Sequence, residues 1–195
     1  MELESRTRRT LLWVWAISAT LLGLTSTVLL LLLYLSTQRR HAGWTRWKAA
    51  EGGNGHWYKA VALHKDVTWS GAERLARLDG GYLATITSAA ENHFVFSLIN
   101  APEFFTDENG AGPALGGYQQ DGAREPDGGW SWVSGEPWEF SSWFPGEPNN
   151  GRARDGYEDR VHYYSSKGRT PAPTWNDANR SDPKQVYSYV VERNE

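Results

Sequence analysis

The absence of cysteine is the feature that most constrains what this chain can fold into. It excludes disulfides, thiolate metal sites and cysteine nucleophiles. The second half of the chain is nevertheless rich in Gly, Pro, Asn and Asp, and a compact domain holds so long an irregular region only when something organises it. With disulfides excluded, buried aromatic side chains such as Trp138 and Trp143 and a bound metal ion remain as candidates.

Charge is unevenly distributed along the chain. Residues 1–51 carry seven Lys and Arg against three Glu, a net charge of +4. Residues 52–195 carry thirteen Lys and Arg against twenty Asp and Glu, a net charge of −7. An acidic region repels polyphosphates, so we expect no nucleic-acid partner. Its oxygens can instead hold a cation.

The segment from Leu11 to Ser36 contains 26 residues and no charge. A helix of that length spans roughly 39 Å at about 1.5 Å per residue, more than the roughly 30 Å hydrocarbon core of a bilayer. A cleaved signal peptide has a shorter apolar stretch, of roughly 7 to 15 residues, and ends at a small-residue cleavage site. We therefore predict a single-pass transmembrane helix, an uncleaved signal-anchor, at residues 11–36.

This prediction divides the chain into four parts. Residues 1–10 form a short N-terminal tail, residues 11–36 the membrane segment, residues 37–52 a juxtamembrane linker and residues 53–195 one folded domain. Basic residues flank the apolar segment on both sides, so charge bias alone does not fix its orientation.

The folded domain shows the patterns of two helices and several strands. Ser70 with Glu73, and Ser88 with Glu91, fit the capping box that opens a helix. Strand-like runs occur at residues 56–61, 82–86, 114–118, 130–133, 161–164 and 186–191. This mixture predicts an α+β domain.

Residues with the chemistry of a cation site gather in the irregular region. Glu147, Pro148 and Asn149 are followed by Glu158 and Asp159, and then by Trp175, Asn176 and Asp177. Carboxylate and amide oxygens without His or Cys form the set suited to calcium. Taken singly, each of these residues is also typical of an ordinary turn.

The order of short motifs is more specific than any one of them. From Gly55 to the end, the sequence resembles a C-type lectin-like domain, particularly the compact cysteine-poor form common in bacteria. The landmarks are His56-Trp57-Tyr58, residues 81–86, Ser88 to Asn92, Leu115-Gly116-Gly117, Trp130-Ser131-Trp132, residues 135–138, Trp143, residues 146–150, Glu158-Asp159 and Trp175-Asn176-Asp177. The resemblance implies a twisted, largely antiparallel sheet with two flanking helices and a long calcium-binding loop region.

Carried over residue by residue, the resemblance implies one calcium site and one carbohydrate site. The calcium ligands would be Glu147, Asn149, Glu158, Asn176 and Asp177, and the first four of these would also bind sugar hydroxyls. In the family, the order Glu-Pro-Asn goes with mannose, glucose, fucose or N-acetylglucosamine, whereas Gln-Pro-Asp goes with galactose. The Glu-Pro bond of the family is usually cis.

Several positions depart from the family pattern. Its cysteine positions are occupied by Ala76 and Val191, which we expect to pack in the core, and by Arg160 and Arg180, which cannot form a bridge and predict a looser loop region without calcium. The segment between Asn149 and Glu158 is long, so Asp155 or Asp159 is an alternative to Glu158 as a ligand. Composition alone suggests a further ion near Asp121, Glu125 and Asp127.

These residues predict a calcium-dependent, carbohydrate-binding membrane lectin that is not an enzyme. A glycosidase would need a carboxylate pair flanking the scissile bond, and Glu147 and Glu158 are better explained as ligands. The open alternative is a lectin-like module that binds a protein partner, with calcium structural or absent. We expect a cytoplasmic N-terminal tail and an extracytoplasmic domain, because weak calcium sites fill only where calcium is plentiful.

Overall fold

The computed structural model describes residues 28–31, 43–106, 108–153, 156–182 and 186–194. Most of the predicted membrane segment and the whole N-terminal tail lie outside these ranges, although residues 28–31 are helical. Within the described ranges, no helix has the length and apolar character needed to cross a bilayer. Residues 43–195 form one compact unit, which includes part of the segment that we assigned to a linker.

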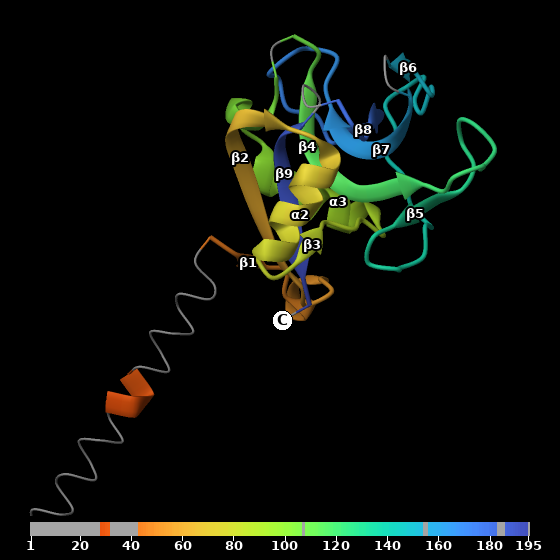
Figure 1. The fold of residues 1–195 in the computed structure, drawn as a ribbon. Coiled ribbons are helices and arrows are strands. Elements are labelled where there is room, and N and C mark those ends of the chain that lie inside the picture. Colours follow the sequence, from red (N-terminus) through yellow and green to blue (C-terminus); the bar gives the residue numbers. More distant parts are fainter. Residues whose placement is uncertain (1–27, 32–42, 107, 154–155, 183–185, 195) are drawn as a thin grey trace, which may run out of the picture. The chain divides into compact units, whose positions relative to one another are not determined.

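Among the described residues of this unit, nine strands form the sheet (Figure 1). They are β1 (Thr45–Arg46), β2 (Trp57–Val67), β3 (Tyr82–Leu83), β4 (Ala111–Gln119), β5 (Trp130–Trp132), β6 (Arg152–Ala153), β7 (Gly156–Tyr164), β8 (Thr174–Asn179) and β9 (Val186–Arg193). The main order is β1-β2-β9-β4-β7-β6, with β3 beside β9, β5 beside β4 and β8 beside β7. The described pairs are antiparallel except β4 with β9, so the sheet is mixed and largely antiparallel, as expected.

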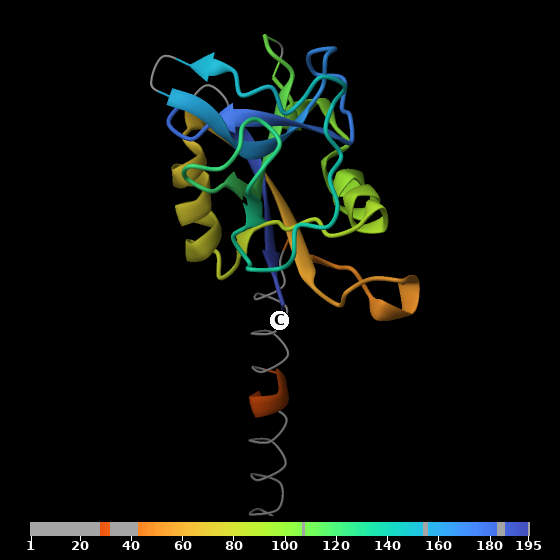
Figure 2. The same ribbon diagram turned by 90° about the vertical axis from the view of Figure 1, so that its right-hand side faces the viewer.

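Two α-helices flank the sheet, α2 (Trp69–Leu78) and α3 (Ala89–Ile99), and they lie on opposite sides of the central strands in Figure 2. Short 3-10 helices are η1 (Ala49–Glu51) and η2 (Pro102–Phe104). The predicted cap of α3 is confirmed, because the Ser88 hydroxyl accepts from the Glu91 amide at 3.1 Å. The predicted cap of α2 is wrong: the cap lies two residues earlier than Ser70, and the Thr68 hydroxyl accepts from the Gly71 amide at 3.1 Å.

Tryptophan side chains organise the irregular region, as expected from the lack of disulfides. Trp138 and Trp143 come from the long segment between β5 and β6 and pack on three tryptophans of β5 and β8. The ring centroids of Trp132 and Trp138 are 4.4 Å apart, and those of Trp130 and Trp143 are 4.9 Å apart. Trp175 has its ring edge-on to both Trp132 and Trp143 and is fully buried. Stacked and edge-to-face contacts of this kind add to the stability gained by burial.

The positions that bear cysteines in the family have two different replacements. Ala76 of α2 and Val191 of β9 are fully buried in one hydrophobic cluster, which confirms the expected core packing. Arg160 and Arg180 both bind the carboxylate of Asp159: Arg160 Nη1 lies 3.1 Å and Arg180 Nε 2.7 Å from Asp159 Oδ2. An intervening carboxylate thus joins the two arginines, and the looser loop region without calcium stays a prediction.

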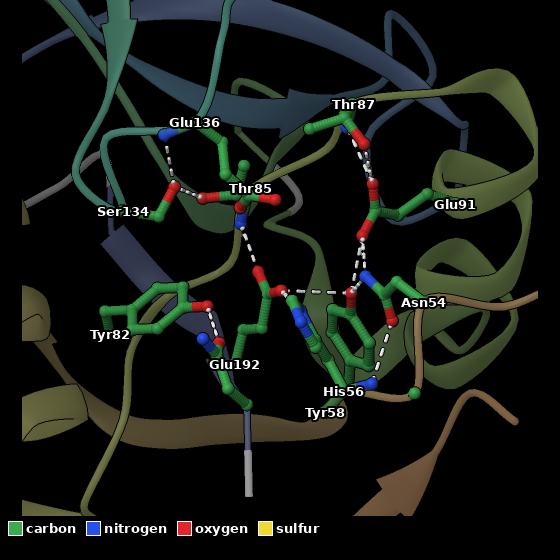
Figure 3. Close-up of polar contacts among 12 residues, drawn as sticks. Asn54, His56, Tyr58, Tyr82, Thr85, Thr87, Glu91, Ser134, Glu136 and Glu192 are labelled. Atoms are coloured by element: carbon green, nitrogen blue, oxygen red, sulfur yellow. Dashed lines mark hydrogen bonds and ion pairs between the residues drawn. The ribbon is translucent and has the colours of Figure 1, made fainter. Parts of the chain in front are cut away.

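A buried polar network ties β2 and β9 to the segment between the two helices (Figure 3). The Glu192 side chain is fully buried, and three donors surround its carboxylate. His56 Nδ1 lies 2.6 Å and Tyr58 Oη 3.1 Å from Oε1, and the Thr85 amide donates to Oε2 at 2.7 Å. Burial raises the pKa of Glu192, whereas the bonds from His56 and Thr85 lower it.

A second buried carboxylate, Glu91 of α3, shares Tyr58 with Glu192. Glu91 accepts from the Tyr58 hydroxyl, from Asn54 Nδ2 at 2.8 Å and from the Thr87 amide at 2.7 Å. A buried carboxylate is stable only when hydrogen bonds replace those it loses to water. Here side chains and backbone amides of the domain supply these hydrogen bonds. The network therefore fixes α3 against β2 and β9.

Candidate calcium and carbohydrate site

The loop from Gly146 to Gly151 has a fixed backbone shape. The Glu147–Pro148 peptide bond is cis, as the family resemblance implied, and Asn150 has a positive φ of 53°. Asparagine tolerates that left-handed conformation better than most residues do. As a result the amides of Asn149 and Asn150 both point at one side chain, that of Asp177, at 3.2 and 2.7 Å.

The hairpin of β7 and β8 supplies the other side of the site. Asp177 lies on β8 opposite Val161 of β7 and has no solvent exposure. A carboxylate that accepts two backbone amides is held rigidly. The hairpin therefore presents a fixed negative charge to the loop.

Glu158 and Asn149 approach each other around Gly151. The Gly151 amide donates to Glu158 Oε2 at 2.9 Å. A Cβ placed on Gly151 would lie 3.0 Å from the Glu158 carboxyl carbon and 3.1 Å from Asn149 Oδ1. Both side chains therefore border the same small volume, which only glycine leaves open to them.

Asn176 lies beside Asp177 and opposite His162 of β7. Its Nδ2 is 2.6 Å from the Asp177 carbonyl oxygen and 3.3 Å from His162 Nε2. With the amide nitrogen oriented by these two acceptors, Asn176 Oδ1 is buried and has no hydrogen-bond partner. The structure thus brings Glu147, Asn149, Glu158 and Asp177 together around this loop, and Asn176 contacts the backbone of Asp177. Their role as calcium ligands stays a prediction.

Glu147 is electrostatically unsatisfied in this arrangement. Its Oε2 is buried and without a partner, as is Oδ1 of Asn150. Burial, together with the negative charge of Asp177, raises the pKa of Glu147 to about 7. The unpartnered oxygens of Glu147 and Asn150 lie beside the carboxylate of Asp177. Such a group of oxygens fits a hard cation, because the cation would supply the missing positive charge.

The donor set fits calcium only if amide oxygens take part. Among the described residues, no group of three or more His, Cys, Asp or Glu side chains is arranged to hold a metal ion. An ion here would therefore depend on amide oxygens as well as on carboxylates. Oxygen-only ligation of this mixed kind is the pattern that calcium accepts.

Of the two alternative ligands, only Asp159 is described, and it pairs with arginines instead. Asp155 lies outside the described residues. Asp159 is held by two arginines, and its neighbour Asp121 pairs with Arg180 at 3.3 Å. Asp127 pairs with Arg124 at 3.0 Å. Arg180 and Arg124 thus pair with Asp121 and Asp127, two of the carboxylates near which composition suggested a further ion.

No family model matches the chain, but individual proteins do. The chain is 34% identical over 113 residues to salivary C-type lectin 2 of Aedes albopictus, a match that covers 57% of this chain and 69% of that protein. The chain belongs to the C-type lectin family. It is also 30% identical over 110 residues to collectin-43 of Bos taurus, covering 56% of this lectin chain but 29% of the length of collectin-43. Both relatives come from animals, so the likeness to bacterial forms stays a prediction.

Solved structures support the same fold. The trimeric Kupffer cell C-type lectin receptor Clec4f matches with a TM-score of 0.58 at 22% identity, over 87% of this chain and 95% of that one. The cow carbohydrate-recognition domain of CD23, determined in the presence of a GlcNAc2Man3 oligosaccharide, matches with a TM-score of 0.56 at 23% identity, over 77% and 92%. A calcium-independent type II antifreeze protein matches with a TM-score of 0.54 at 21% identity, over 78% and 92%.

The sequence did not identify three residues that shape the site. Asn150 and Gly151 contribute backbone amides to Asp177 and Glu158, and only their place in a Gly-Pro-Asn-rich run hinted at such a turn. His162 contacts Asn176 because β7 and β8 pair in this register. Register between distant strands has no short-range sequence signal, so His162 could not be found from its own neighbours.

Proposed function

We propose that this protein is a calcium-dependent lectin that binds sugars of the mannose, glucose, N-acetylglucosamine and fucose class. The observation that carries the proposal is the group of buried, unpartnered acceptor oxygens of Glu147, Asn150 and Asn176 next to the buried carboxylate of Asp177. Such oxygens are costly in a folded protein unless a ligand binds them. Membership of the C-type lectin family makes calcium the ion to expect.

The residues around the ion would recognise the sugar through its hydroxyls. Bound calcium would accept oxygen lone pairs from two neighbouring sugar hydroxyls. Glu147 and Glu158 carry acceptors for the protons of these hydroxyls, whereas Asn149 and Asn176 carry amide donors for their oxygens. Charge-assisted hydrogen bonds of this type are the stronger ones, and they require the hydroxyls to lie in a set order. We take the order Glu147-Pro148-Asn149 as support for the mannose class.

Membrane anchoring and topology belong to the same proposal. The uncharged segment 11–36 would anchor the protein, with residues 1–10 in the cytoplasm and the lectin domain outside it. Protease added to intact cells should remove the domain and spare the N-terminal residues. Survival of the domain together with loss of the N-terminus would reverse the proposed topology.

One observation favours a second function, a lectin-like module that binds a protein partner without calcium. Asp177 is already satisfied by two backbone amides, and a calcium-independent antifreeze protein shares the fold. The same fold therefore does not by itself require the ion.

A double substitution distinguishes the two functions. Glu147→Gln with Asn149→Asp keeps an oxygen at each position but exchanges donor and acceptor roles around one hydroxyl. On a glycan array in saturating calcium, the parent should bind mannose-class sugars and the variant should shift toward galactose. The loss of affinity for the original sugar should exceed about 1 kcal/mol, the lower bound for one unpaired buried polar group. A parent that binds no monosaccharide, or a variant that keeps the parent's preference, would support the protein-partner function instead.

A further inference from the structure

Aromatic and basic side chains form a ladder at the end of the domain that contains its first strand, β1. In register, Arg46 of β1 lies opposite Trp57 of β2, which lies opposite Arg193 of β9. Residues directly opposite each other on neighbouring strands place their side chains on the same face of a sheet. These three side chains therefore form one row across three strands.

Cation–π contacts connect this row to a second one. The Arg46 guanidinium lies 5.7 Å from the centroid of the Trp57 ring, and that of Arg193 lies 4.1 Å from the Trp44 ring. Lys59 Nζ is 5.9 Å from the same Trp44 ring. We refer to Trp44, Arg46, Trp57, Lys59 and Arg193 as the β1 ladder. Neither tryptophan is fully buried, and Arg46 is exposed.

The position of the β1 ladder is opposite to that of the sugar site. Figures 1 and 2 show β1 and the C-terminus at one end of the domain, and β6 with the adjoining ends of β7 and β8 toward the other. The domain as a whole is acidic, since residues 52–195 have seven more acidic than basic residues. Three cations of the β1 ladder gather at this end, although one of them, Lys59, also pairs with Asp79 at 2.7 Å.

We propose that the β1 ladder docks on the anionic surface of a lipid bilayer. Tryptophan is enriched at the level of the lipid headgroups, and each Lys or Arg near an anionic surface strengthens binding by a factor of about five. The inference also rests on the proposed membrane anchor. Residues 37–42 separate the predicted membrane segment from the domain, and six residues span at most roughly 22 Å. A tether that short keeps the first strand of the domain close to the bilayer and would hold the sugar site facing away from it.

The test uses residues 43–195 without the membrane segment. This part is one compact unit that contains both hydrophobic clusters, so we expect it to fold alone. Its partition onto vesicles of phosphatidylcholine with phosphatidylglycerol is compared with that onto pure phosphatidylcholine, by flotation at low ionic strength. A chelator is present throughout, so failure of the calcium site would not affect the result.

Two double variants with the same charge change separate the ladder from general electrostatics. Arg46→Gln with Lys59→Gln removes two cations of the ladder, and binding to the anionic vesicles should fall about 25-fold. Arg124→Gln with Lys167→Gln removes two exposed cations from distant loops and should change binding by less than about threefold. Thermal melts check that both variants fold. A parent that does not bind the anionic vesicles, or two variants that lose binding equally, would overturn the proposal.

Discussion

The substitution His56→Gln tests whether the buried Glu192 carboxylate depends on a neighbouring cation. His56 Nδ1 lies 2.6 Å from Glu192 Oε1, and Glu192 has no solvent exposure. The hydrogen bond to Glu192 raises the pKa of His56, and burial opposes that effect. Glutamine keeps a neutral donor but cannot carry the positive charge.

The size of the effect and its pH dependence follow from this geometry. A hydrogen bond to a charged group contributes about 1.5 to 3 kcal/mol, and a neutral one about 1. Because the pKa of His56 is higher in the folded than in the unfolded state, its charge stabilises the domain fully below about pH 6.5. That contribution disappears as pH rises through the folded-state pKa. We therefore expect a loss of about 1 to 2 kcal/mol at pH 5.5 that shrinks by pH 9.

The measurement is thermal or urea unfolding of residues 43–195 at several pH values. For a domain of this size, 1 kcal/mol shifts Tm by roughly 2 to 4 °C. The matched control is His93→Gln, because His93 lies on the exposed face of α3. A loss that does not vary with pH would refute the ionic account, and so would an equal loss in the His93→Gln variant.

Two further predictions concern the features that replace disulfides. Trp175→Leu removes a fully buried ring and leaves Asn92 Oδ1 without one of its donors, so urea unfolding should show a loss of about 3 to 5 kcal/mol. A loss below about 1 kcal/mol would contradict the role of the tryptophan cluster. Asp159→Asn should cost about 3 kcal/mol, because it leaves the largely buried Arg160 unpaired, whereas Arg180→Gln should cost less than about 1 kcal/mol because that side chain is 44% exposed. The reverse order would show that Asp159 does not join the two arginines.

Local sequence signals predicted the frame of the domain but not all of its strands. The predicted runs at residues 114–118 and 186–191 lie within β4 and β9. The strand β8 was missed because Asn176 and Asp177 have the composition of a turn. Pairing with β7 overrides that preference, since tertiary context decides strand formation.

The buried face of α3 also could not be read from hydrophobicity. Helical spacing of apolar residues places Ala90, Phe94 and Leu98 in one stripe, but Glu91 and Asn92 are buried and Ala90 is exposed. The reason is the polar network, which draws Glu91 inward to Tyr58. Four of the predicted site residues, Glu147, Asn149, Glu158 and Asp177, lie around one loop, because the family order of motifs carried information about three-dimensional neighbours that spacing alone does not hold.

Calcium titration of residues 43–195 by calorimetry, with the Asp177→Asn variant as control, tests the central claim most directly. The parent should bind calcium, and at 100 times the dissociation constant calcium should stabilise it by about 2.7 kcal/mol, seen as a higher Tm that a chelator reverses. Asp177→Asn keeps the size of the side chain but removes the fixed buried charge, and it should bind calcium far more weakly. A parent with no heat of binding and the same Tm in chelator and in millimolar calcium would contradict the calcium-dependent account.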